Sequence, residues 1–126
     1  MAYILVADDD ASCLKLLEME LRQEGHDVGL ASDGEEALRK VSEHRPDLVI
    51  LDVMMPNKDG FATCKAIRQL DGCAELPVIA LTSLDDTFGV HEAHQAGFSS
   101  LLWKPWQVRV LQAKVRAFLE VSGAAD

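Results

Sequence analysis

Five short runs of apolar residues recur along the chain, and a longer segment with helical periodicity follows most of them. Val, Ile and Leu dominate these runs, which alternate little with polar residues, as is typical of strands buried on both faces of a sheet. The runs cover residues 3–7, 28–31, 48–51, 78–81 and 101–103. Repeated strand-then-helix units predict an α/β domain whose parallel sheet is covered by helices on both faces.

Start and stop signals frame the predicted helices. Candidate N-cap residues precede the first four: Asp10, Asp33, Asp59, and either Asp85 or Asp86. Gly25 and Gly97 suit the ends of the first and fourth helices. Pro105 suits the first turn of the last helix, where its missing N–H costs nothing. The inward stripe of that helix is predicted to be Val108, Leu111, Val115 and Phe118.

The length of 126 residues is enough for one domain, which we expect to span 1–122 and to be followed by a tail at 123–126. The chain is expected to be either a complete single-domain protein or a domain cut from something longer. An apolar run of the ~20 residues needed to span a bilayer is missing, and so is a basic segment leading into an export signal. We therefore expect no membrane association.

Charge and cysteine content restrict the expected binding partners, metal sites and cellular location. A formal net charge of −9 argues against direct contact with nucleic acid, because phosphate neutralisation needs clustered Lys and Arg. Cys13, Cys64 and Cys73 are odd in number and form no CxxC pair, which argues against a disulfide framework and a thiolate zinc site. Reduced thiols of this kind indicate a cytoplasmic protein.

Acidic, hydroxyl and basic side chains cluster just after the predicted strands, where ligands of open parallel sheets bind. They are Asp8, Asp9 and Asp10 after the first, Asp52 after the third, Thr82 and Ser83 after the fourth, and Lys104 after the fifth. Packed carboxylates repel one another, and a hard divalent cation such as Mg²⁺, with about six oxygen ligands, removes the repulsion. A carboxylate at the centre of such a site can act as the nucleophile toward a phosphoryl group.

At this point the chain resembles the receiver domain of two-component response regulators over essentially its whole length. Four separated motifs carry the resemblance: Asp8-Asp9 after ILVA, Asp52 in LDVMMPNKDG, Thr82 in ALTS, and Lys104-Pro105. The resemblance implies a flavodoxin-like, doubly wound five-stranded parallel sheet of strand order 2-1-3-4-5 with five helices. It also makes a cis Lys104–Pro105 bond an expectation.

The same resemblance implies roles for the acidic residues. Asp52 would be the phosphoacceptor, taking its phosphoryl group from the phosphohistidine of a sensor histidine kinase or a histidine phosphotransfer protein. Asp9 would bind Mg²⁺ directly, Asp8 would act mainly through a bound water, and the carbonyl of Met54 would be the backbone ligand. Asp52 would complete the metal site.

The resemblance also implies a switch. Thr82 would hydrogen-bond the phosphoryl group and shift toward it, while Lys104 would pair with a phosphoryl oxygen. The fourth helix, fifth strand and fifth helix would then change their face toward an effector protein. Leu101 stands where the family usually has Tyr or Phe, and Trp103, on the same sheet face, is a candidate replacement for that ring. A monomer or a weak phosphorylation-dependent dimer is expected.

Two other functions compete. Leu101 supports a receiver-like protein docking module that works without phosphorylation. A Mg²⁺-dependent phosphatase is disfavoured, because such enzymes usually carry a second Asp two residues after the nucleophile, where this chain has Met54. We therefore expect a signalling phosphoacceptor with slow self-catalysed phosphotransfer and dephosphorylation, and not an enzyme with a metabolic reaction. His91 and His94 are three residues apart, not the four of an HExxH zinc motif.

Overall fold

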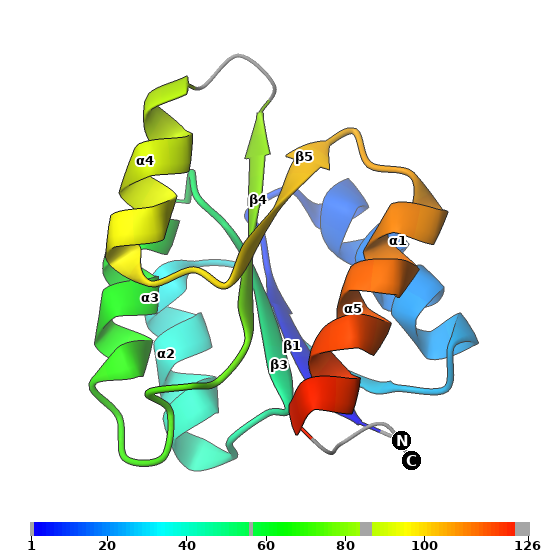
Figure 1. Ribbon diagram of the computed structural model, residues 1–126, viewed down its shortest axis with the longest axis horizontal. Coiled ribbons are helices and arrows are strands. Elements are labelled where there is room, and N and C mark those ends of the chain that lie inside the picture. The colour runs from blue at the N-terminus through cyan, green and yellow to red at the C-terminus, as the bar shows by residue number, and fades with distance from the viewer. Residues whose placement is uncertain (1, 56, 84–86, 123–126) are drawn as a thin grey trace.

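The computed structural model describes residues 2–55, 57–83 and 87–122, which form a parallel sheet flanked by helices (Figure 1). Its strands are β1 (Tyr3–Ala7), β2 (Asp27–Ala31), β3 (Leu48–Asp52), β4 (Val78–Ser83) and β5 (Ser100–Lys104). They lie in the order β2-β1-β3-β4-β5, and every neighbouring pair is parallel. The doubly wound α/β fold predicted from the sequence is thereby confirmed.

Five helices connect and follow the strands: α1 (Ala11–Gln23), α2 (Gly34–Glu43), α3 (Gly60–Arg68), α4 (Thr87–Ala96) and α5 (Val108–Ser122). α1 and α5 cover one face of the sheet, and α2, α3 and α4 cover the other (Figure 1). The carboxylates of Asp10, Asp33 and Asp59 accept hydrogen bonds from the first-turn N–H groups of α1, α2 and α3, which confirms these N-caps. The caps predicted for α4 lie outside the described residues.

Alternation along the strands divides the core into two parts, because successive side chains point to opposite faces of a sheet. In β3, Val49 and Leu51 pack toward α2, α3 and α4, whereas Leu48 and Ile50 pack toward α1 and α5. All five residues of β3 are buried. This central strand therefore has no polar alternation, and it ends on the one acidic side chain of the run, Asp52.

The last helix differs from its prediction. α5 begins at Val108, so Pro105 lies in the preceding loop, where a cis peptide bond joins it to Lys104. The prediction that Pro105 occupies the first turn is wrong because the loop continues through Trp106, which packs against the core between α1 and α5. The cis bond itself agrees with expectation.

The inward stripe of α5 is also shifted. Val108 is 38% exposed, whereas Leu111, Val115 and Leu119 are buried. These three residues lie four apart, so they share one face of the helix. Phe118 is only partly buried against the same core. The tail expected at 123–126 lies outside the described residues.

Among residues 2–55, 57–83 and 87–122, none of the helices combines the length and the apolar character that a bilayer crossing requires.

Candidate functional site

The site lies at the carboxyl edge of the sheet, where four neighbouring strands end. Asp8 directly follows β1, Asp52 is the last residue of β3, and Lys104 is the last residue of β5. Thr82 lies near the end of β4, where it pairs in register with Trp103 of β5. The strand order therefore brings together side chains from separated parts of the chain.

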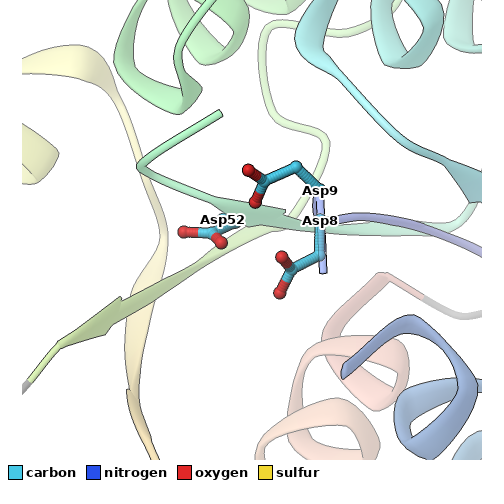
Figure 2. A group of neighbouring side chains, drawn as sticks. All are labelled: Asp8, Asp9 and Asp52. Carbon is cyan, nitrogen blue, oxygen red and sulfur yellow. The ribbon is translucent and has the colours of Figure 1, made fainter. Parts of the chain in front are cut away.

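Three carboxylates form the acidic part of the site. One oxygen each from Asp8, Asp9 and Asp52 lies within 4.8 Å of the other two. The three side chains extend from the ends of β1 and β3 toward the same side (Figure 2). Asp8 is fully buried and Asp52 is 6% exposed, whereas Asp9 is exposed. The cluster thus gathers oxygen ligands that are buried at Asp8 and Asp52 and exposed to solvent at Asp9.

Lys104 reaches into this cluster from β5. Its Nζ donates hydrogen bonds to Asp8 Oδ2 at 2.8 Å and to Asp52 Oδ2 at 2.9 Å. Burial acts to lower the pKa of Lys104, but the hydrogen bonds to the two carboxylates and their charges outweigh it and hold that pKa above its usual value. The ammonium is therefore charged and fixed beside both acids.

Burial has the largest effect on the pKa of Asp8. It raises the pKa of the Asp8 carboxyl, and the charge of Asp52 raises it further. Hydrogen bonds from Lys104 and from the N–H of Asp10 act in the opposite direction, yet the pKa stays above its ordinary value. One ammonium therefore does not fully compensate the buried negative charge of this cluster.

The loop after β3 orients Asp52. The N–H of Met54 donates to Asp52 Oδ1 at 3.0 Å, and Gly60, the first residue of α3, packs against the backbone of Asp52 and Val53. Asn57 has a φ of 68°, and its amide donates to Asp33 Oδ2 at 3.0 Å at the start of α2. Asn57 was not among the residues predicted from the sequence to form the site. Its tolerance of left-handed backbone was the one available signal.

Thr82 is a buried polar residue of the site whose hydroxyl lacks a hydrogen-bond partner in the described parts of the chain. It is 3% exposed, and its Oγ1 has no hydrogen-bond partner among the described residues. An unpaired buried hydroxyl is unfavourable, so the position suits a group that brings its own oxygen atoms. The side chain of Ser83 is not among those described.

The remaining candidate residues lie elsewhere. His91 and His94 are exposed on α4. Within the described parts of the chain, the group of side chains able to hold a metal ion is the Asp8, Asp9 and Asp52 cluster. The three cysteines are free thiols, and burial raises the pKa of Cys64 to about 11.

Comparison with known proteins gives a consistent result. AfsQ1 of Streptomyces coelicolor, a transcriptional regulatory protein, is 41% identical over 119 residues, which is 94% of this chain and 52% of AfsQ1. The crystal structure of a putative response regulator from Chloroflexus aurantiacus superposes with a TM-score of 0.91 at 34% identity, covering 94% of this chain and 98% of that one.

A third relative is the receiver domain of the sensor histidine kinase PA1611 from Pseudomonas aeruginosa. It matches with a TM-score of 0.86 at 30% identity over 97% of this chain and 98% of its own. Its crystal structure has a magnesium ion coordinated in the active site cleft.

The chain spans about half the length of the curated relatives that it matches. The name of AfsQ1 is that of a transcriptional regulator, so this relative gives no support to the expectation that nucleic acid is not a direct partner. Residues 4–116 match the model of the response regulator receiver domain. With this match over most of its length, the chain belongs to the receiver domain family of two-component response regulators.

Proposed function

We propose that Asp52 accepts a phosphoryl group from the phosphohistidine of a sensor histidine kinase or a histidine phosphotransfer protein. The position of the Asp52 carboxylate is the observation that supports this proposal most directly. The carboxylate lies 2.9 Å from the Lys104 ammonium and within 4.8 Å of oxygens of Asp8 and Asp9. This arrangement concentrates charge around a single carboxylate that retains 6% exposure to solvent.

The donor set fits Mg²⁺. Carboxylate oxygens of Asp8, Asp9 and Asp52 are hard ligands, and three acids around one ammonium keep an excess of negative charge. Asp9 and Asp52 would hold the ion directly with the carbonyl of Met54, and Asp8 would act mainly through water. When bound, Mg²⁺ supplies positive charge that offsets the carboxylates and the oxygens of the phosphoryl group.

In the reaction, a carboxylate oxygen of Asp52 attacks phosphorus and forms a new O–P bond. The P–N bond to the imidazole breaks, and its electron pair stays on the ring nitrogen, which takes up a proton. The product on Asp52 is a mixed anhydride. Lys104, which already contacts Asp52 Oδ2, pairs with a phosphoryl oxygen and so stabilises the charge that arrives.

Thr82 links this chemistry to the outer surface. Its hydroxyl lacks a partner, so it can donate to a phosphoryl oxygen without breaking an existing hydrogen bond. Thr82 and Trp103 are register partners on β4 and β5, and paired residues of parallel strands share a sheet face. A shift of Thr82 therefore bears on Trp103 and favours one of two states of the surface formed by α4, β5 and α5.

Mass spectrometry of the intact protein tests the proposal. Incubation with acetyl phosphate and Mg²⁺ should add the mass of one phosphoryl group to the wild-type chain and none to Asp52→Asn. Asp47→Asn is the matched control, because Asp47 precedes the same strand at its opposite end and accepts from the N–H of Tyr3 at 2.8 Å. It should gain the group at the wild-type rate.

Two results would count against the proposal. An equal adduct on Asp52→Asn would place the phosphoryl group elsewhere. A folded wild-type chain without an adduct would favour a docking module that works without phosphorylation. Transfer from a phosphorylated histidine kinase domain then extends the test to the natural donor. Three further expectations stay predictions: an effector protein as downstream partner, a cytoplasmic location, and an oligomeric state of monomer or weak phosphorylation-dependent dimer.

A further inference from the structure

We propose that Glu20 of α1 is a positioning residue for Lys104, acting through the indole of Trp106. Glu20 was not among the residues predicted from the sequence to form the site, and it lies outside the acid cluster. The part of this inference that concerns phosphorylation rests on the function proposed for Asp52, whereas the part that concerns the position of Lys104 does not.

A hydrogen bond joins α1 to the loop that follows β5. Trp106 Nε1 donates to Glu20 Oε1 at 2.8 Å, across 86 residues of sequence. Trp106 is partly buried against the core between α1 and α5, and an indole N–H in such a place usually needs an acceptor. A carboxylate acceptor makes this hydrogen bond stronger than one between neutral groups.

The bond holds the chain on one side of Lys104. On the other side the backbone is held by the sheet, where Lys104 pairs in register with Ser83. Trp106 comes two residues after Lys104, where β5 ends, and two residues before Val108, where α5 begins. The lysine is therefore fixed between a strand pairing and the Glu20 bond.

Such fixing matters because a lysine side chain is long and flexible. Its ammonium must stay within hydrogen-bond distance of both Asp8 and Asp52, at 2.8 Å and 2.9 Å. A loop free to move by about 1 Å would lose this geometry, and misplacements of that size are costly in reacting sites. Glu20 thus contributes to the position of the ammonium without contacting it.

The structure supplies a matched control. Arg116 Nη2 of α5 pairs with Oε1 of Glu24, the C-cap residue of α1, at 2.7 Å, so this ion pair joins α5 to the end of α1. Arg116 lies well within α5, away from the loop that follows Lys104. Removing Glu24 changes the contact between the helices and leaves the Trp106 bond in place.

The first readout needs no phosphorylation. Acetylation of Lys104 by an N-hydroxysuccinimide ester is followed by peptide mass spectrometry, with the exposed Lys65 as internal reference. Lys104 should react about threefold faster in Glu20→Ala, because a mobile loop frees its amine from the two carboxylates. Glu20→Gln keeps an acceptor oxygen, and this variant and Glu24→Ala should match wild type. Equal rates in Glu20→Ala and wild type would overturn the inference.

The second readout is the rate of phosphorylation by acetyl phosphate. Glu20→Ala should slow it about tenfold and Glu20→Gln much less, since the conservative change retains the hydrogen bond. In a Lys104→Ala background the Glu20→Ala change should have no further effect, because residues that act through one another are not additive. Equal slowing in both backgrounds would mean a merely structural role and would overturn the inference.

The two readouts separate the inference from the proposed function. A wild-type chain that takes no phosphate would contradict the role of Asp52, while the acetylation of Lys104 would still decide whether Glu20 positions it. Trp106→Phe removes the donor and should reproduce Glu20→Ala in both assays. A Trp106→Phe chain with wild-type Lys104 reactivity would contradict the route through the indole.

Discussion

Asp8 combines the deepest burial in the site with a negative charge. Its carboxylate is 0% exposed and lies beside Asp52, and the Lys104 ammonium 2.8 Å away is its cationic partner. Burial raises the pKa of Asp8 above its ordinary value of 3.8 despite that partner. Ionised Asp8 therefore opposes folding when no divalent cation is present, so this residue serves the site at the expense of the fold.

The pH dependence of stability follows from this shift. The folded chain holds the Asp8 proton more tightly than the unfolded chain, so the stabilisation is complete below the unfolded pKa, near 3.8. It is lost as the pH rises through the higher folded pKa. Asp8→Asn should therefore raise the free energy of unfolding at pH 7 by about 1 kcal/mol, with a smaller gain toward pH 4.

Urea unfolding of both chains in EDTA, at several pH values between 4 and 8, measures this difference. Asp47→Asn makes the same change of charge away from the cluster and should not show the same pH-dependent gain. A less stable Asp8→Asn at pH 7 would mean that the ion pair with Lys104 outweighs the burial of Asp8.

At the scale of elements, the start of α3 fixes the backbone of Asp52. A Cβ on Gly60 would overlap the carbonyl oxygen of Asp52 and lie 2.7 Å from the Cα of Val53. Gly60→Ala should push α3 away from β3, lowering the free energy of unfolding by about 1–3 kcal/mol and slowing phosphate uptake.

Gly72 is the matched control for this change. It has a φ of 78° and open space around the position of a Cβ. Gly72→Ala should cost about 1 kcal/mol through backbone strain and leave phosphate uptake at the wild-type rate. Chemical denaturation and intact mass together check both variants. If phosphate uptake slowed equally in Gly60→Ala and Gly72→Ala, then stability, and not the position of Asp52, would control the rate of uptake.

The elements differ in how well the sequence predicted them. Buried apolar runs and acidic caps are local signals, so the strands and the starts of α1, α2 and α3 were predicted closely. The start of α5 depends on the packing of Trp106 against the core, a tertiary contact that Pro105 did not reveal. The acid cluster was predicted because strand order brings the ends of strands together, but the bond of Glu20 to Trp106 spans 86 residues without a local signal.

At the scale of the whole molecule, the strand order brings the acid cluster together. Within the sheet, β2 lies next to β1 on one side and is reached through α1. β3 lies next to β1 on the other side, so the direction in which strands are added reverses at β1. α1 and α3 consequently leave toward opposite faces (Figure 1). Asp8 and Asp52 end neighbouring strands at this point of reversal, where open α/β sheets bind their ligands.

Cation binding should therefore change the stability of the whole domain. A ligand that binds only the folded chain stabilises it by about 2.7 kcal/mol at a hundredfold excess over its dissociation constant. Mg²⁺ at that excess should give wild type this gain in urea unfolding at pH 7, measured against NaCl of equal ionic strength. Asp9→Asn should lose most of the gain and Asp47→Asn should keep it. An equal gain in all three chains would indicate general screening of the net charge of −9 instead of binding at the acid cluster.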